Sequence, residues 1–502
     1  MSIFFLYLYI KIRHMLQQQK ELELSNYPEL YDLLIPKDHL LRSISELVDF
    51  SFVYDELKDK YCSNNGRMAE DPIRMFKYLL LKCIYNISDV DVVKRTLTDL
   101  SFKFFLGLRP EETKLIDPSL LSKFRRQRLK DMKLMDLLIA KTVCIAREKG
   151  IIKTNYIIVD ATHSRSRSNP VNAVDYLTYQ LGQAAQAVHA ADKDFVLPEI
   201  PKEKKLQPVL TAAEAFIEAV EADHVLSSYP AVAERLNMVK EVIADVRVRQ
   251  VTSKDPDARI GHKSKTRPFF GFKTHMAMTI ERIVTAAVAT TGEADDGKAL
   301  PELVDKTEKN GVEVKTVIGD TAYSGKANLD MIRDKNEHEN KDIKLCSPLN
   351  PVISNGTKRN AVFDYNKDAG MFVCPAGHMA VSKSSQNRRN NGKYHNPAFV
   401  YYFDIEKCKT CPMREGCYKP GAKKKTYHVT IKSKEHQKQL EYEKTAEFKS
   451  LQRKRYMIEA KNAELKNVYG YDRAMSYGLA CMEMQGAMAI FASNLKRIIK
   501  LM

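Results

Sequence analysis

Apolar and polar positions divide the chain into stretches of different texture. Over residues 30–148 the apolar positions recur at helical spacing, interrupted by cap and turn signals. Asp71-Pro72 supplies an N-cap followed by proline at the first helical position, which predicts a helix over Ile73–Tyr85. Another helix is expected from Pro118, with basic residues at its end. Short helices with basic ends suit a DNA-binding bundle, or a helical domain whose surface is simply basic.

Beyond Gly150 the pattern changes to short β-branched runs mixed with helices. Tyr156–Val159 reads as a buried strand that stops at Asp160. Further strands are expected at Phe269–Thr279, Ile283–Thr290 and Val312–Ile318, with a helix at Asp296–Asn310 between the last two. Residues 169–250 are Ala-rich and helical, 345–432 are short-stranded and loop-rich, and 435–502 are mostly helical. This order of helices, then strands mixed with helices, then helices predicts an α/β core with appended or inserted pieces.

Composition narrows the classes of function. The 502 residues carry a formal charge of +17, which favours nucleic acid first and an acidic membrane surface second. The longest apolar run, Ile3–Ile10, is far shorter than the roughly 20 residues that a bilayer requires, so no membrane span is expected. Positive charge follows this run rather than preceding it, which favours an N-terminal extension, with Met15 as an alternative start, over a secretory signal. Nine cysteines, five of them scattered, indicate reduced thiols and a cytoplasmic protein.

Two acids follow apolar strands in similar settings. Asp160 ends the first predicted strand, and Asp320 comes two residues after Ile318. Ligand sites in open α/β sheets gather at such strand ends, so paired carboxylates there can hold divalent cations. Each Asp alone is equally well explained as a turn acid or helix N-cap.

A third carboxylate is expected on the basic C-terminal helix. Arg455, Glu459 and Lys466 fall on one stripe, whereas Glu464 points about 140° away from Glu459 at 100° per residue. A carboxylate between two cations can hold metal next to phosphate; exposed i,i+4 salt pairs would give the same pattern. Residues 421–470 carry thirteen Lys and Arg against six Asp and Glu, so the positive charge is concentrated around this helix.

Together these motifs resemble the DDE transposases of bacterial insertion sequences, in the subgroup with a Tyr-Arg-Glu-Lys signature on the catalytic helix. Arg455, Glu459 and Lys466 fit the spacing, and Gln452 stands at the Tyr position. The resemblance covers almost the whole chain from about Ile35 and rests on several further motifs. They are Ile-Ile-Val-Asp160-Ala-Thr, Gly-Asp320-Thr-Ala-Tyr323, Lys254–Arg259, Phe270–His275, Gly66-Arg67 with Asp71-Pro72, Phe124-Arg125 and Asn494–Arg497.

The resemblance implies a ribonuclease H-like catalytic core, a mixed sheet flanked by helices. The expected order is an extension (1–28), a helical DNA-binding and dimerisation domain (29–148) and a catalytic domain (149–502). Because 160 residues separate Asp160 from Asp320 and 139 separate Asp320 from Glu459, we expect two insertions in the catalytic domain. They are a helical insertion at 169–250 and a Cys-containing β-rich insertion at 345–432.

The resemblance also implies the chemistry and the partners. Asp160, Asp320 and Glu459 would be catalytic and would bind Mg²⁺ or Mn²⁺ during cleavage of element ends and transfer of the 3′-OH into target DNA. Arg455 and Lys466 would contact phosphate. The partners would be double-stranded DNA, as terminal inverted repeats and as target, and a second copy of the chain in a synaptic homodimer. A ribonuclease H-like nuclease or resolvase without strand transfer, and a non-catalytic DNA-binding derivative, are the alternatives.

Two further groups of residues, apart from the three acids, could bind DNA or metal. Ser164–Ser168 is a basic polar loop whose Arg165 and Arg167 either touch DNA or are simply solvated. Cys374, Cys408, Cys411 and Cys417, with His378 as a further candidate, offer thiolates of which two have x2 spacing. They predict either a structural Zn²⁺ site or a reduced cluster without metal.

Overall fold

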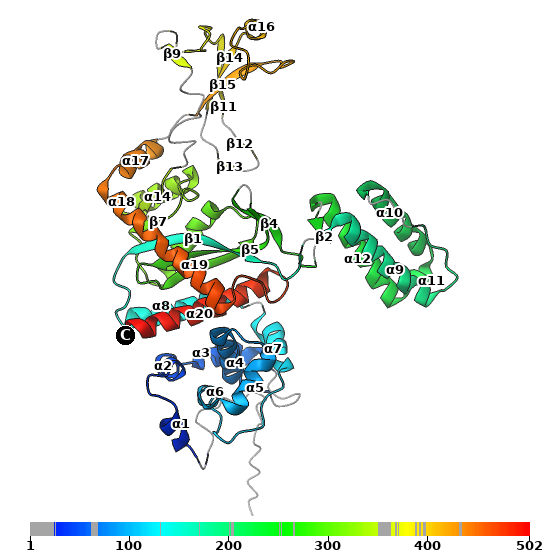
Figure 1. The fold of residues 1–502 in the computed structure, drawn as a ribbon, viewed down its shortest axis with the longest axis vertical. Coiled ribbons are helices and arrows are strands. Elements are labelled where there is room, and N and C mark those ends of the chain that lie inside the picture. The colour runs from blue at the N-terminus through cyan, green and yellow to red at the C-terminus, as the bar shows by residue number, and fades with distance from the viewer. Residues whose placement is uncertain are drawn as a thin grey trace, which may run out of the picture.

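The computed structural model shows a central α/β body with three attached units (Figure 1). It describes residues 25, 27–61, 69–130, 132–169, 171–199, 201, 205–249, 251–252, 254–264, 267–349, 363–366, 369, 371–386, 389–390, 393–394, 398–430 and 434–502. The predicted extension up to residue 24, and the Gly66-Arg67 motif, lie outside these residues. No helix in the described ranges is both long and apolar enough to cross a membrane.

The N-terminal unit is helical, as the sequence predicts. Its elements are α1 (Glu29–Leu34), α2 (Leu40–Leu47), α3 (Ser51–Leu57), η1 (Lys58–Lys60), α4 (Pro72–Tyr85), α5 (Asp89–Thr98), α6 (Leu100–Leu106), α7 (Ser119–Phe124), η2 (Arg125–Leu129) and α8 (Leu134–Glu148). The Asp71 carboxylate accepts from the Ile73 amide and starts α4 as expected. Asp89 forms a paired hydrogen bond with the Arg125 guanidinium and an ion pair with Lys82 at 2.7 Å. Arg125, part of a motif expected to bind DNA, is therefore used inside the helical unit.

The central body is built on a mixed sheet. Its elements are β1 (Tyr156–Arg165), β4 (Arg259–Ser264), β5 (Arg267–Thr279), β6 (Val284–Thr291), η3 (Asp296–Ala299), α13 (Leu300–Lys309), β7 (Thr316–Ile318), α14 (Lys326–His338), β8 (Lys344–Cys346), α17 (Lys434–Glu443), α18 (Ala446–Gln452), η5 (Arg453–Arg455), α19 (Tyr456–Tyr469) and α20 (Leu479–Leu501). Among the described strands, six form this sheet in the order β4-β5-β1-β7-β8, with β6 also paired to β5. The pairs β1–β5 and β5–β6 are antiparallel, whereas β1–β7 and β7–β8 are parallel.

Two strand predictions are corrected by this sheet. β1 does not stop at Asp160 but continues to Arg165, because β5 pairs with it antiparallel along Ile157–Arg165. The parallel pairing with β7 does end at Ile158, so Asp160 lies just beyond that shared edge. The strand predicted over Val312–Ile318 is shorter than expected: β7 begins only at Thr316, where pairing to β1 and β8 starts.

α20 joins the central body to the helical unit. It packs against α8 and α4 on one side and against β6 on the other. Asn494, fully buried in α20, donates to the Thr142 hydroxyl of α8 at 3.0 Å and exchanges two backbone hydrogen bonds of 2.9 Å with Val284 of β6. The core of the helical unit therefore continues into one face of the sheet.

Two units extend from the sheet region (Figure 1). The first has its own apolar core and contains β2 (Val171–Asn172), α9 (Ala173–Ala191), α10 (Leu206–Ala222), α11 (His224–Ser228), α12 (Pro230–Arg249) and β3 (Val251–Thr252). The second contains β9 (Asp364–Asn366), β10 (Met371–Val373), β11 (Ser382–Gln386), β12 (Arg389–Asn390), β13 (Lys393–Tyr394), β14 (Ala398–Phe403), α16 (Ile405–Lys409) and β15 (Lys425–Thr430). Their helical and β-rich textures agree with the sequence; that they are insertions into a family core stays a prediction.

Candidate active site

Asp160 is a half-buried carboxylate on β1, facing the C-terminal helix α19. The side-chain amide of Asn462 on α19 donates to its Oδ2 at 2.9 Å. Burial raises the pKa of Asp160 to about 6, and the negative charges of Asp320 and Asp296 add to the rise. The backbone amide of Ala161 and the positive charge of Arg455 oppose it. The carboxyl is thus held close to two other acids and one cation.

Asp320 is two residues past the end of β7 and is half-buried. Its Oδ1 accepts from the Ala322 amide at 2.9 Å, so it also organises the turn that follows the strand. The Ser347 hydroxyl donates to the backbone oxygen of Asp320 and fixes the loop to the end of β8. The turn-acid role and a site role are therefore compatible, because the charge of Asp320 acts on Asp160.

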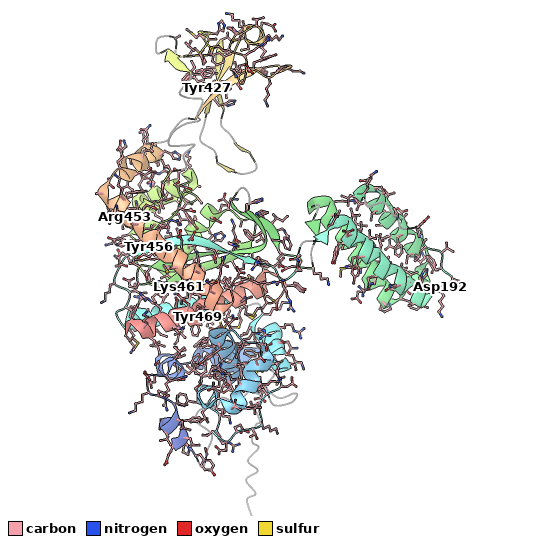
Figure 2. All side chains as sticks on the ribbon, in the orientation of Figure 1. Asp192, Tyr427, Arg453, Tyr456, Lys461 and Tyr469 are labelled. Atoms are coloured by element: carbon pink, nitrogen blue, oxygen red, sulfur yellow. The ribbon has the colours of Figure 1, made fainter. Side chains whose placement is uncertain are left out.

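The predicted catalytic helix lies across the sheet. α19 packs on β1 and on α20, and Figure 2 shows Lys461 and Tyr469 on it. Glu459 is 54% exposed and accepts from Arg455 at 2.5 Å. Arg455 itself stands in η5, one residue before α19 begins, and its charge still reaches Asp160. Arg455 is thus paired with Glu459, and its charge acts on Asp160.

Glu464 points away from this group, as helical geometry predicts. It accepts from the Ser493 hydroxyl of α20 at 3.0 Å and pairs with Lys461 at 2.9 Å. Lys461 is 1% exposed and donates to the same hydroxyl at 2.7 Å. This face of α19 is therefore the packing face.

The other predicted DNA-contact residues gather at the C-terminal end of the stripe. Lys466 Nζ is 3.4 Å from Nδ1 of His163, whose ring packs against that of Phe269 in a tilted arrangement. Arg165 pairs with Asp472, and Arg167 donates to the backbone oxygen of Met475 at 2.8 Å. The basic loop after β1 is thus attached to the segment between α19 and α20, with both guanidinium groups still exposed.

Gln452, which occupies the Tyr position of the signature, has a structural contact. Its amide donates to the carbonyl oxygens of Gly319 at 3.0 Å and Cys346 at 2.5 Å. These carbonyls lie at the ends of β7 and β8, so Gln452 fastens the entry to the catalytic helix to the edge of the sheet that carries Asp320.

Comparison with known families agrees with this geometry. Residues 29–127 match the transposase domain family DUF772, and residues 373–499 match a transposase DDE domain family. The chain is a DDE transposase of the insertion-sequence type. No curated protein and no solved structure matches it. The DDE match includes Glu459 but neither aspartate. A DDE domain implies a ribonuclease H-like core, and the transposase family implies a DNA substrate.

Three residues near the acids escaped the sequence analysis as site residues. Asn462 continues the stripe of Arg455, Glu459 and Lys466, a spacing that could have identified it. Asp296 opens η3 and pairs with Lys273 at 2.8 Å. Tyr323, quoted only as a motif residue, is fully buried, and its hydroxyl has no hydrogen-bond partner among the described residues.

The donors suit the divalent cations that this family requires. Carboxylate oxygens are the preferred ligands of Mg²⁺ and Mn²⁺. Burial raises the pKa of Asp160, and the negative charges of Asp320 and Asp296 add to the rise. The side-chain oxygen of Asn462 is likewise buried, with no hydrogen-bond partner in the part of the chain that the structure describes. In the described part of the chain, no three His, Cys, Asp or Glu side chains stand close enough to hold an ion as they are. The Glu459 carboxylate is paired with Arg455.

The cysteines of the β-rich unit surround one pocket. A cavity of about 330 Å³ is lined by Cys374, Cys408, Cys411, Cys417 and His378. Burial raises the pKa of the Cys408 thiol, and the other three thiols add to the rise. A turn stabilised by the Gly377 amide, which donates to the Cys374 carbonyl at 2.8 Å, presents the first of them. The structure thus brings together all five residues that the sequence singled out.

Proposed function

We propose that this transposase cleaves phosphodiester bonds at the ends of its element and joins the freed 3′-OH to target DNA at Asp160, Asp320 and Glu459. The observation that carries the proposal is the electrostatic grouping of two aspartates with the catalytic helix, through Asn462 and Arg455. Divalent cations held by the three carboxylates would activate the attacking oxygen and neutralise the leaving oxygen.

The residues around the acids position them and the DNA. Asn462 donates to one oxygen of Asp160, and the charges of Asp320 and Arg455 also act on this carboxyl. Arg455 lies between Glu459 and Asp160, where its guanidinium can take a phosphate oxygen when DNA approaches. Lys466 and the exposed Arg165 and Arg167 extend positive charge from the acids along the DNA path.

Substitution of the acids tests this assignment. Asp160→Asn and Asp320→Asn should abolish cleavage of an end-containing duplex while leaving its binding intact, measured on gels in Mg²⁺. Glu464→Gln is the matched control, because it lies on the packing face of the same helix. Cleavage at the normal rate by the Asp160 variant would refute the site.

The joining step separates transposition from simple nuclease action. With pre-cut ends and a circular target, the transposase should form covalent end-target products. Cleavage without such products would favour a nuclease or resolvase instead. We also propose that two copies assemble on paired ends, which light scattering of the complex would detect as a homodimer.

A second proposal concerns the β-rich unit, where we infer a structural Zn²⁺ site made by Cys374, Cys408, Cys411 and Cys417. The shared pocket supports it, since thiolates that lie together are the usual ligands of structural zinc. To bind the ion, the four thiols would have to move closer to one another than they are in this structure. Purified protein should contain about one equivalent of zinc, and Cys408→Ser should lose it. Cys144→Ser, an exposed cysteine on α8, is the control. Less than about half an equivalent in the unaltered protein would exclude the site.

A further inference from the structure

One acid of the central body is not used by the proposed chemistry although the fold places it near the site. Asp296 begins η3, shortly after β6 ends. Its charge acts on Asp160 together with that of Asp320. Its immediate partner is Lys273 of β5, whose Nζ lies 2.8 Å from Oδ1 of Asp296 and 2.8 Å from the Ala294 carbonyl oxygen.

The packing of η3 on the Asp320 loop explains why this acid is so near. Gly297 leaves no room for a Cβ, since one there would overlap the carbonyl oxygen of Ala322. The buried amide of Asn328 donates to the carbonyl oxygens of Gly297 and Tyr323, both at 2.9 Å. The loop that carries Asp296 and the loop that carries Asp320 are therefore held together by backbone contacts.

The Asp320 loop carries a buried polar atom that indicates a ligand. Tyr323 is 0% exposed, and within the described ranges its hydroxyl has no hydrogen-bond partner. The charges of Asp160, Asp296 and Asp320, and that of Asp295, all act on it. A buried hydroxyl without a hydrogen bond is costly, by roughly 1–3 kcal/mol, unless something absent from the protein itself satisfies it. A cation with its bound water among the three carboxylates would do so.

We propose that Asp296 is a fourth carboxylate of the metal site, facing Asp160 and Asp320 near the Tyr323 hydroxyl, and that Lys273 occupies it until the cation arrives. The proposal rests on the metal site put forward above. It assigns Lys273 a defined effect: the lysine competes with the cation for Asp296. A purely structural Lys273–Asp296 ion pair has no such effect on metal.

Binding of Mn²⁺ alone to the full-length chain, followed by electron paramagnetic resonance of the unbound ion, tests this without activity. Asp296→Asn should weaken binding at least tenfold, whereas Lys273→Met should tighten it several-fold. Asp295→Asn is the matched control, because the charge of Asp295 acts on Tyr323 as that of Asp296 does, and asparagine retains the acceptor for the Gly297 amide. The Mn²⁺ that is lost in Asp160→Asn is the ion bound at the proposed active site.

The outcomes separate the two proposals. If Asp160→Asn loses Mn²⁺ but Asp296→Asn binds like the unaltered protein, the fourth ligand is refuted while the active site stands. If Asp296→Asn and Lys273→Met weaken binding equally, the pair is structural and the inference fails. If Asp160→Asn binds Mn²⁺ normally, the metal site itself is wrong. Circular dichroism of each variant establishes that binding is compared between folded proteins.

Discussion

Replacing Asp160 by Asn should stabilise the metal-free transposase around β1, although it destroys activity. Burial, together with the like charges of Asp320 and Asp296, raises the pKa of this carboxylate from the usual 3.8 to about 6. Asparagine keeps an oxygen for the Asn462 amide and carries no charge. The variant therefore retains the hydrogen bond and removes both the burial of a charge and the repulsion.

The sign and size of the effect follow from proton linkage. Because the folded pKa lies above the unfolded one, the folded state loses stability as pH rises from 3.8 through 6, and the full cost applies above 6. At 1.36 kcal/mol per pKa unit, the cost is about 3 kcal/mol at pH 8 and about 1 kcal/mol at pH 4.5. The variant should gain those amounts relative to the unaltered protein.

Hydrogen exchange of peptides from β1, measured with EDTA present and corrected for intrinsic rates, reports the local free energy of opening. The difference between variant and unaltered protein should grow by about 2 kcal/mol from pH 4.5 to pH 8. Asp192→Asn is the control, since Asp192 ends α9 in the separate helical unit (Figure 2). A difference independent of pH, or stronger protection of the unaltered protein at pH 8, would refute the reasoning.

Three further substitutions test the framework of the site. Asn494→Ala should lower the free energy of unfolding by about 2–4 kcal/mol in urea, because it leaves buried groups of α8 and β6 without partners. Asp89→Asn should lower the free energy of unfolding of the helical unit by about 2 kcal/mol at neutral pH. The reason is that two cations, Arg125 among them, outweigh burial and lower the pKa of Asp89 to about 2. Unfolding followed by circular dichroism should show this difference disappear as pH falls from about 4 to 2. Gly297→Ala should weaken Mn²⁺ binding, because its Cβ would push η3 away from Ala322.

Several motif residues of the resemblance turn out to have structural contacts. Asp255 accepts from the Ser166 hydroxyl at 2.9 Å and from the Gly478 amide at 3.0 Å, which connects the end of β1 to the start of α20. Asn494 connects three elements, and Gln452 connects two strand ends to the catalytic helix. The sequence identified these positions by type and order, but their partners lie about 90 to 350 residues away and could not be read from spacing.

Local sequence patterns indicate some residues of the proposed site but not those whose proximity depends on contacts between distant segments. Asp160, Asp320 and the α19 stripe follow from local periodicity, and the structure places Asp160 and Asp320 near one another. Asp296 could not be recognised, since an acid at the start of a short helix reads as an ordinary N-terminal residue. Its proximity depends on the contact between η3 and the Asp320 loop, which is made by a glycine and a buried asparagine.

The arrangement of cations around the acids connects metal binding to DNA binding. Glu459 is paired with Arg455 and Asp296 with Lys273, from α19 on one side and β5 on the other. If both acids turn to a divalent cation, both positive side chains are released from their partners at the proposed metal site, where the scissile phosphate would lie. The proposals therefore predict that the cation strengthens DNA binding at the site, and that the gain depends on Arg455 and Lys273. A gain in affinity of equal size in an Arg455→Ala, Lys273→Met double variant would show that the released cations do not contact the phosphate.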